Sequence, residues 1–114
     1  MQSDFAVRAL GALAQEHRLA AYRLLVQSGA SGVAAGALAE ALAVPASSMS
    51  FHLSQLINAG LATQRRAGRS IVYSADYKAM SALMSYLTEN CCGGAECETP
   101  VVCEPAAPSA RAIA

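Results

Sequence analysis

All four cysteines of this chain lie in one short segment near its C-terminus. They are Cys91, Cys92, Cys97 and Cys103 in a sequence of 114 residues, and two of them are adjacent. Thiolate sulfur is a soft ligand that suits ions such as As(III), Sb(III), Cd(II), Zn(II) and Cu(I). Outside oxidising compartments, clustered cysteines bind metal or sense redox state more often than they form structural disulfides. The segment therefore predicts a thiolate site.

The spacing of the thiols indicates how such a site would assemble. Cys91 and Cys92 follow the last predicted helix and precede a pair of glycines. Adjacent residues in a regular helix diverge by about 100°, so both thiols can turn toward one ion only where the helix frays. The glycines then allow the chain to fold back with a third thiol. Loop entropy favours Cys97 over Cys103 by only about 0.7 kcal/mol, so spacing leaves the third ligand open.

Other roles for the cysteines fit the segment less well. As(III) prefers three sulfurs and no histidine, and no histidine follows His52. Zinc sites built from four cysteines usually contain two Cys-x-x-Cys pairs, which are absent here. Redox sensing favours a thiolate in an electropositive setting, whereas these thiols follow a helix C-terminus among glutamates. Metalloid binding is the favoured hypothesis. Redox sensing and a tail without a role remain alternatives.

Charge and composition divide the chain into a body and a tail. Before Glu89 there are seven basic and four acidic residues (7 − 4 = +3), and from Glu89 onward one basic and four acidic residues (1 − 4 = −3). Residues 91–114 show no periodicity, which predicts a flexible, Cys-containing tail behind a folded domain at 1–90. The chain has neither a long apolar run nor a signal-peptide start, so we expect a cytoplasmic protein without a membrane partner.

Residue periodicity within the body predicts a mainly α fold with a small β-hairpin. Apolar spacing and stop residues indicate helices at about 3–14, 15–28, 35–42, 46–58 and 76–90. Residues 61–75 alternate with period two around a predicted Ala67-Gly68 turn. The core is aliphatic and small, with 5% aromatic residues and no Trp. A core of this kind is often completed by dimerisation.

Two helices joined by a three-residue turn, followed by a basic hairpin, form a winged helix-turn-helix, whose second helix enters the DNA major groove. At 100° per residue, Met49, Leu53, Leu56 and Ile57 share the core face of helix 46–58. The hydroxyls and amide elsewhere on that helix suit base edges and phosphates, and the phenyl ring suits a thymine methyl. The predicted contacts to double-stranded DNA from this helix are Ser47, Ser48, Ser50, Phe51, Ser54 and Gln55.

The hairpin carries three arginines near its tip, namely Arg65, Arg66 and Arg69. A guanidinium at such a tip can bind phosphate or enter the minor groove. We therefore predict that these three residues form the DNA-binding part of the wing.

The stretch "SSMSFHLSQLINAGLATQRRAGRSIVYS" resembles the recognition helix and wing of the ArsR/SmtB metalloregulatory repressors. "LAQEHRLAAYRLL" is similar to the family's second helix, although Glu16-His17-Arg18 replaces part of the usual Asp-x-x-Arg. The resemblance covers about residues 5–90. It implies a homodimer built on the first and last helices and bound to a partly palindromic operator. It also implies release from DNA when a metal or metalloid binds.

Two metal sites of that family have no counterpart in this chain. "SGVAAGALAEAL" lacks the Cys-Val-Cys-like arsenic motif, and "DYKAMSALMSYLTEN" lacks the histidines of the last-helix zinc site. What remains resembles the arsenic-responsive branch with a Cys-Cys pair after the last helix. That resemblance implies Cys91, Cys92 and Cys97 as ligands and leaves Cys103 unassigned.

These expectations describe an arsenite-responsive repressor, with As(III) or alternatively Sb(III) as inducer and no catalytic cofactor. We expect no enzyme, because the chain has no Gly-rich phosphate loop and no Ser-His-Asp set. The alternatives are a repressor that responds to thiol oxidation or to another soft metal (Sb, Cd or Zn), and a thiol-rich metal-binding module without DNA function.

Overall fold

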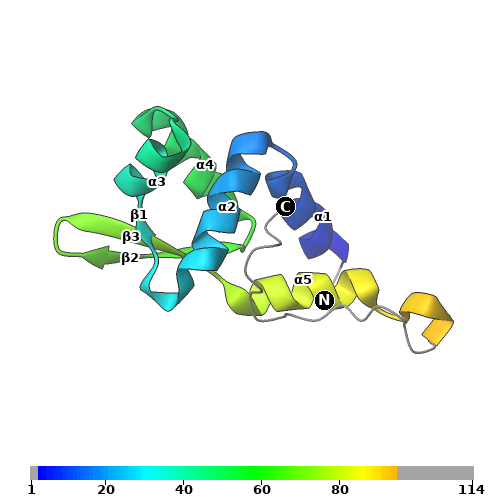
Figure 1. The fold of residues 1–114 in the computed structure, drawn as a ribbon. Helices are drawn as coiled ribbons and strands as arrows, with labels where there is room; N and C mark the ends of the chain where they lie inside the picture. The colour runs from blue at the N-terminus through cyan, green and yellow to red at the C-terminus, as the bar shows by residue number, and fades with distance from the viewer. Residues whose placement is uncertain (1–2, 95–114) are drawn as a thin grey trace, which may run out of the picture.

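The computed structural model describes residues 3–94, which form five α-helices and a small sheet at one side of them (Figure 1). The predicted tail 91–114 lies outside this range except for its first four residues. No helix in the described range is long and apolar enough to cross a membrane. The elements are α1 (Ser3–Leu13), α2 (Glu16–Ser28), η1 (Gly29–Ser31), β1 (Val33–Ala34), α3 (Ala35–Leu42), α4 (Ala46–Asn58), β2 (Ala62–Ala67), β3 (Ser70–Ala75), α5 (Tyr77–Thr88) and η2 (Cys91–Gly94).

The five predicted helices are confirmed, and local residues explain where they begin and end. The Asp76 side chain accepts a hydrogen bond from the Ala79 backbone N–H at 3.1 Å and is the N-cap of α5. Gln15 caps α2 through a bond from the Arg18 N–H at 2.9 Å. Gly29 ends α2 with a φ of +75°, which a glycine adopts without strain.

The core lies where α2, α3 and α4 pack together, and α1 and the sheet contribute smaller buried residues to it. Its largest fully buried side chains are Leu25, Leu38, Met49, Leu53, Leu56 and Leu61. Three of these come from α4, and Ile57 packs against them while partly buried. The predicted core face of this helix is therefore confirmed. Its opposite face points away from the protein.

The sheet contains one strand that was not predicted. Its order is β1-β3-β2, antiparallel throughout, with Val33 opposite Tyr73. A strand of two residues is too short to show a period-two pattern, so sequence reasoning missed it. The pairing of Ala67 with Ser70 places Gly68 and Arg69 at the hairpin tip. The predicted turn was wrong by one residue, because Gly68 takes the positive φ of +65° while Ala67 stays in the ladder.

Gly32 allows η1 to lead into β1, which gives a test of the sheet. It has a φ of +75°, and a Cβ placed there would lie 2.5 Å from the carbonyl oxygen of Tyr73. We expect Gly32→Ala to lower the free energy of unfolding by about 2 kcal/mol or more, because strain and backbone overlap add. Urea denaturation measures the loss.

Gly36→Ala is the matched control, since nothing lies within 4 Å of a Cβ at that position inside α3. It should leave stability unchanged or raise it by up to about 1 kcal/mol. Equal stability of the two variants would contradict the proposed role of Gly32.

Candidate nucleic-acid interface and cysteine site

The predicted DNA-contact residues of α4 lie together on its solvent side. Phe51 is 57% exposed, and Ser47, Ser50 and Ser54 are also exposed. The other two, Ser48 and Gln55, are partly buried at the edges of this face. The Ser54 hydroxyl donates to the Phe51 carbonyl at 2.9 Å, which leaves its oxygen as an acceptor toward a ligand. The face thus combines small polar groups with one large exposed ring.

The β2–β3 hairpin extends from the side of the helical body as a wing (Figure 1). Its three arginines are exposed, but they are not equivalent. Arg65 donates from Nη2 to the carbonyl oxygen of Ser31 at 2.8 Å, which anchors it to η1. Arg66 follows on the same strand, so its side chain leaves the opposite face. Arg69 stands at the tip. Of the three predicted wing contacts, Arg65 is therefore anchored to the body, Arg66 leaves the other face of the hairpin, and Arg69 lies at its tip.

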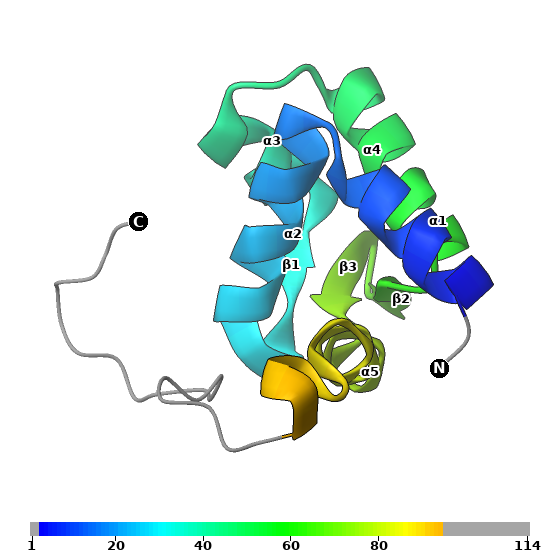
Figure 2. The same ribbon diagram turned by 90° about the vertical axis from the view of Figure 1, so that its right-hand side faces the viewer.

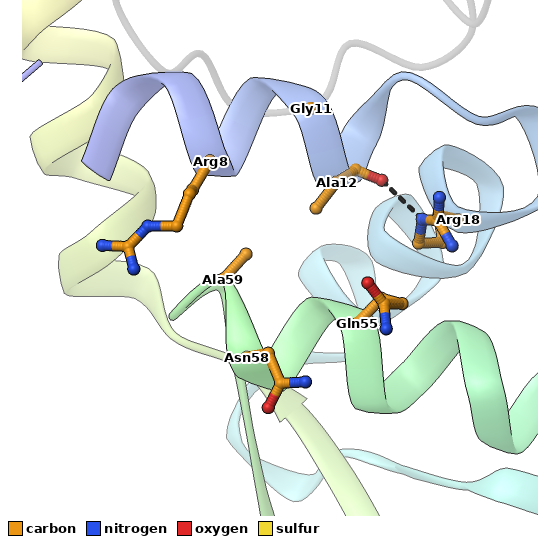
Figure 3. A pocket seen from close by; sticks show the side chains of 7 residues that line it. All are labelled: Arg8, Gly11, Ala12, Arg18, Gln55, Asn58 and Ala59. Carbon is orange, nitrogen blue, oxygen red and sulfur yellow. Dashed lines mark hydrogen bonds between the residues drawn. The ribbon is translucent and has the colours of Figure 1, made fainter. Parts of the chain in front are cut away.

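A pocket of about 190 Å³ lies between α1, the start of α2 and the end of α4 (Figure 3). It brings Gln55, already predicted as a DNA contact, together with residues that sequence reasoning missed. Of these, Asn58 could have been found, because it lies seven residues after Phe51 and thus on the same helix face. Arg8 could not, because only the packing of α1 places it there. The lining residues are Arg8, Gly11, Ala12, Arg18, Gln55, Asn58 and Ala59.

His52 connects α4 to α2 behind the exposed face. Its Nδ1 lies 3.4 Å from Nη1 of Arg18, and the Arg18 Nε donates to the Ala12 carbonyl at 2.8 Å. The rings of His17 and His52 stand 5.7 Å apart between centroids. Burial lowers the pKa of His52 below its ordinary value, and the charges of Arg18 and His17 lower it further. His52 is itself partly buried, beside the core face of α4.

A pKa lowered by folding makes stability depend on pH. The His52 contribution is present above its ordinary value of 6.5 and is lost as the pH falls, because the unfolded chain then binds the proton more readily. We expect the stability lost between about pH 7 and pH 5 to be smaller in His52→Gln than in the unaltered protein. Urea denaturation across this range measures both curves. His17 is present in both proteins, so identical curves would show that His52 is not the group responsible.

The first two cysteines lie just beyond α5, on the side of the molecule opposite the wing (Figures 1 and 2). The helix ends at Thr88, and Asn90, Cys92 and Gly93 have φ values of +57°, +60° and +65°. The expected break in the helix is confirmed. Both Cys91 and Cys92 are exposed.

The other predicted ligand, Cys97, lies outside the described residues, as does Cys103. Within residues 3–94, no three His, Cys, Asp or Glu side chains are grouped to hold a metal ion. The part of the chain that the structure describes therefore holds two of the three predicted ligands, and at least one more thiol would have to come from the remainder.

Comparison with known proteins gives consistent matches. A helix-turn-helix domain family model matches residues 13–65. An ArsR-like transcriptional regulator from Rhodococcus sp. RHA1 is 25% identical, with a TM-score of 0.67 over 75% of this chain and 77% of that chain. A possible transcriptional regulator for arsenical resistance is 30% identical, with a TM-score of 0.62 over 69% of this chain and 79% of that chain.

A third solved structure is the homodimeric winged helix-turn-helix DNA-binding domain of a possible ArsR-family regulator from Mycobacterium bovis. It is 27% identical, with a TM-score of 0.61 over 84% of this chain and 89% of that chain. A search of curated proteins found no match.

The matches agree with the winged helix-turn-helix architecture described above. They extend over most of the described residues and over more than two thirds of each solved structure. All three solved structures are described as regulators or possible regulators of transcription, and the Mycobacterium bovis domain is described as DNA-binding. The chain belongs to the ArsR family of winged helix-turn-helix transcriptional regulators.

Proposed function

We propose that the protein is an arsenite-responsive repressor that binds operator DNA as a homodimer and leaves it when As(III) binds Cys91, Cys92 and Cys97. The observation that carries this proposal is the adjacent pair of exposed thiols just beyond α5 of a winged helix-turn-helix, where Asn90 and Cys92 have left-handed backbone. One similar solved structure is described as a possible regulator for arsenical resistance, which supports the choice of inducer.

In this proposal, α4 lies in the major groove and the wing contacts the backbone. Ser47, Ser50 and Phe51 are exposed on the first turns of α4, the part of a recognition helix that usually contacts base edges. Arg66 and Arg69 are the wing residues that extend beyond the body toward phosphates. Arg65 acts mainly by holding the wing to η1 through Ser31.

The dimer interface is proposed on α1 and α5, which contact each other within one subunit. Val7 and Leu10 of α1 are 68% and 43% exposed, and Met84 and Leu87 of α5 are 46% and 56% exposed. Fully burying an aliphatic side chain of this size is worth roughly 1.5–3 kcal/mol, so these four residues can drive association. The similar domain from Mycobacterium bovis is described as homodimeric.

Inducer binding at the end of α5 would act through this interface. Because α5 carries both the apolar dimer face and, just after it, the thiols, drawing a third thiol toward Cys91 and Cys92 would pull on the end of an interface helix. Two half-sites one helical turn apart require the recognition helices to stand about 34 Å apart. A small change in the angle between subunits therefore reduces the affinity for DNA.

The function is tested by fluorescence anisotropy of a labelled duplex from the gene's own upstream region. We expect the reduced protein to bind at low salt and arsenite to release it. Cys91→Ser or Cys92→Ser should abolish release while leaving DNA affinity within about twofold, because neither thiol lies near α4 or the wing. Comparing Cys97→Ser with Cys103→Ser identifies the third ligand.

Parallel titrations with antimonite, zinc and peroxide separate the possible signals. If only zinc or peroxide releases the DNA, the repressor function stands and arsenite is excluded as its inducer. If the protein binds arsenite but no duplex at low salt, the repressor proposal is wrong, because a basic DNA-binding surface must show salt-dependent affinity.

The dimer is tested by Leu87→Glu, which places a charge in the proposed interface. We expect this variant to sediment as a monomer at micromolar concentration and to bind the duplex at least tenfold more weakly, because one subunit engages only one half-site. Leu19→Glu on α2 is the matched control, since Leu19 is 45% exposed and lies on neither α1 nor α5. A monomer produced by the control alone would place the interface elsewhere.

A further inference from the structure

The pocket between α1, α2 and α4 has the chemistry of an oxyanion site. Figure 3 shows Arg8 and Arg18 at opposite ends of the lining, with Gln55 and Asn58 of α4 in between and the Arg8 guanidinium extending away from Arg18. Among the residues that the structure describes, no carboxylate lines it. Two guanidinium groups beside two side-chain amides favour an anion with several oxygen acceptors.

The polar groups of this pocket differ in how they are held. Arg18 is fixed, because its Nε donates to the Ala12 carbonyl and its Nη1 lies near His52. By contrast, the side chains of Arg8, Gln55 and Asn58 make no hydrogen bond within residues 3–94. Arg8 and Asn58 are also exposed. The pocket thus combines one rigid cation with donors that are available to a ligand.

The location of the pocket indicates which anion it meets. Asn58 lies on the face of α4 that carries Phe51 and Ser54, because positions seven and four residues apart share a helix face. Gln55 lies between that face and the pocket. A duplex lying along α4 would therefore bring its sugar-phosphate backbone past this end of the helix, next to Arg8.

We propose that this pocket binds a backbone phosphate of the operator, as a third contact region besides the exposed face of α4 and the wing. Arg8 supplies the mobile charge, Asn58 an N–H donor, and Arg18 a fixed positive field at the base. This assignment rests on the proposed DNA-binding function. It adds α1 to the DNA-binding surface, which links the dimer helix directly to the duplex.

Gly11 provides a way to test the pocket without disturbing the fold. It lies inside α1, and nothing is within 4 Å of a Cβ placed there. Gly11→Glu would put a carboxylate at the pocket wall, and Gly11→Gln would put a neutral side chain of the same size there. Both residues are better helix formers than glycine, so both variants should fold.

The experiment measures duplex affinity across a salt series for these two variants and for Arg8→Gln. We expect Gly11→Glu to bind roughly tenfold more weakly than Gly11→Gln, and Arg8→Gln to lose a similar factor with a salt slope smaller by about 1. Arg23→Gln controls for net charge, since Arg23 is exposed on α2 outside the pocket. It should change affinity by less than about twofold.

The outcomes separate this inference from the proposed function. If the unaltered protein binds the duplex but Arg8→Gln matches Arg23→Gln, the phosphate assignment is overturned and the repressor proposal stands. If the unaltered protein binds no duplex at low salt, both are overturned. NMR titration with inorganic phosphate tests whether the pocket binds a free anion instead of the operator. Saturable chemical-shift changes at Arg8 and Asn58, together with unchanged DNA affinity in Arg8→Gln, would overturn the proposal. The ligand of the pocket would then be a small oxyanion and not an operator phosphate.

Discussion

The burial of one face of α4 is the constraint on which the rest of the structure depends. Met49, Leu53 and Leu56 are completely buried against the neighbouring helices, which fixes the rotation of α4 about its own axis. Since a helix repeats every 3.6 residues, fixing the apolar side also fixes the opposite side. The exposed serines and Phe51 are therefore held by packing rather than by contacts of their own. A rotation of α4 by even one residue step would turn the ring of Phe51 out of this exposed face and expose core leucines.

Polar contacts then connect this helix to its surroundings. Arg18 reaches three places at once, namely the end of α1 through the Ala12 carbonyl, the rear of α4 through His52, and the pocket beneath α1. The wing has a similar anchor in the Arg65–Ser31 bond, and β1 holds β3 from the other side. Except for the Arg18–Ala12 bond, these contacts join segments far apart in sequence. They explain how a small aliphatic core can position a DNA-binding surface that extends beyond it.

The first two proposed inducer-binding cysteines and the wing are far apart in the structure. Cys91 and Cys92 lie beyond the end of α5, whereas the wing projects from the opposite side of the body (Figure 1). In the proposed function, a signal from the thiols passes through α5, whose exposed Met84 and Leu87 are proposed to face a second subunit. In this proposed arrangement the subunit interface transmits the signal. Both α1 and α2 contact α5 and α4, α2 through the Tyr77 hydroxyl, which donates to its Leu25 and Val26 carbonyls. The pocket beneath α1 lies on that route.

The sequence by itself determined the helices, the core face of α4, the hairpin and the end of α5 before the cysteines. All of these follow from local rules of periodicity, capping and helix-stop residues, which act over a few residues. The tertiary structure alone decided the pairing of β1 with β3, the anchoring of Arg65 and the assembly of Arg8, Arg18 and Asn58 around one pocket. Those features join residues that are up to about 50 positions apart, and no local pattern encodes such contacts because they depend on how whole elements pack.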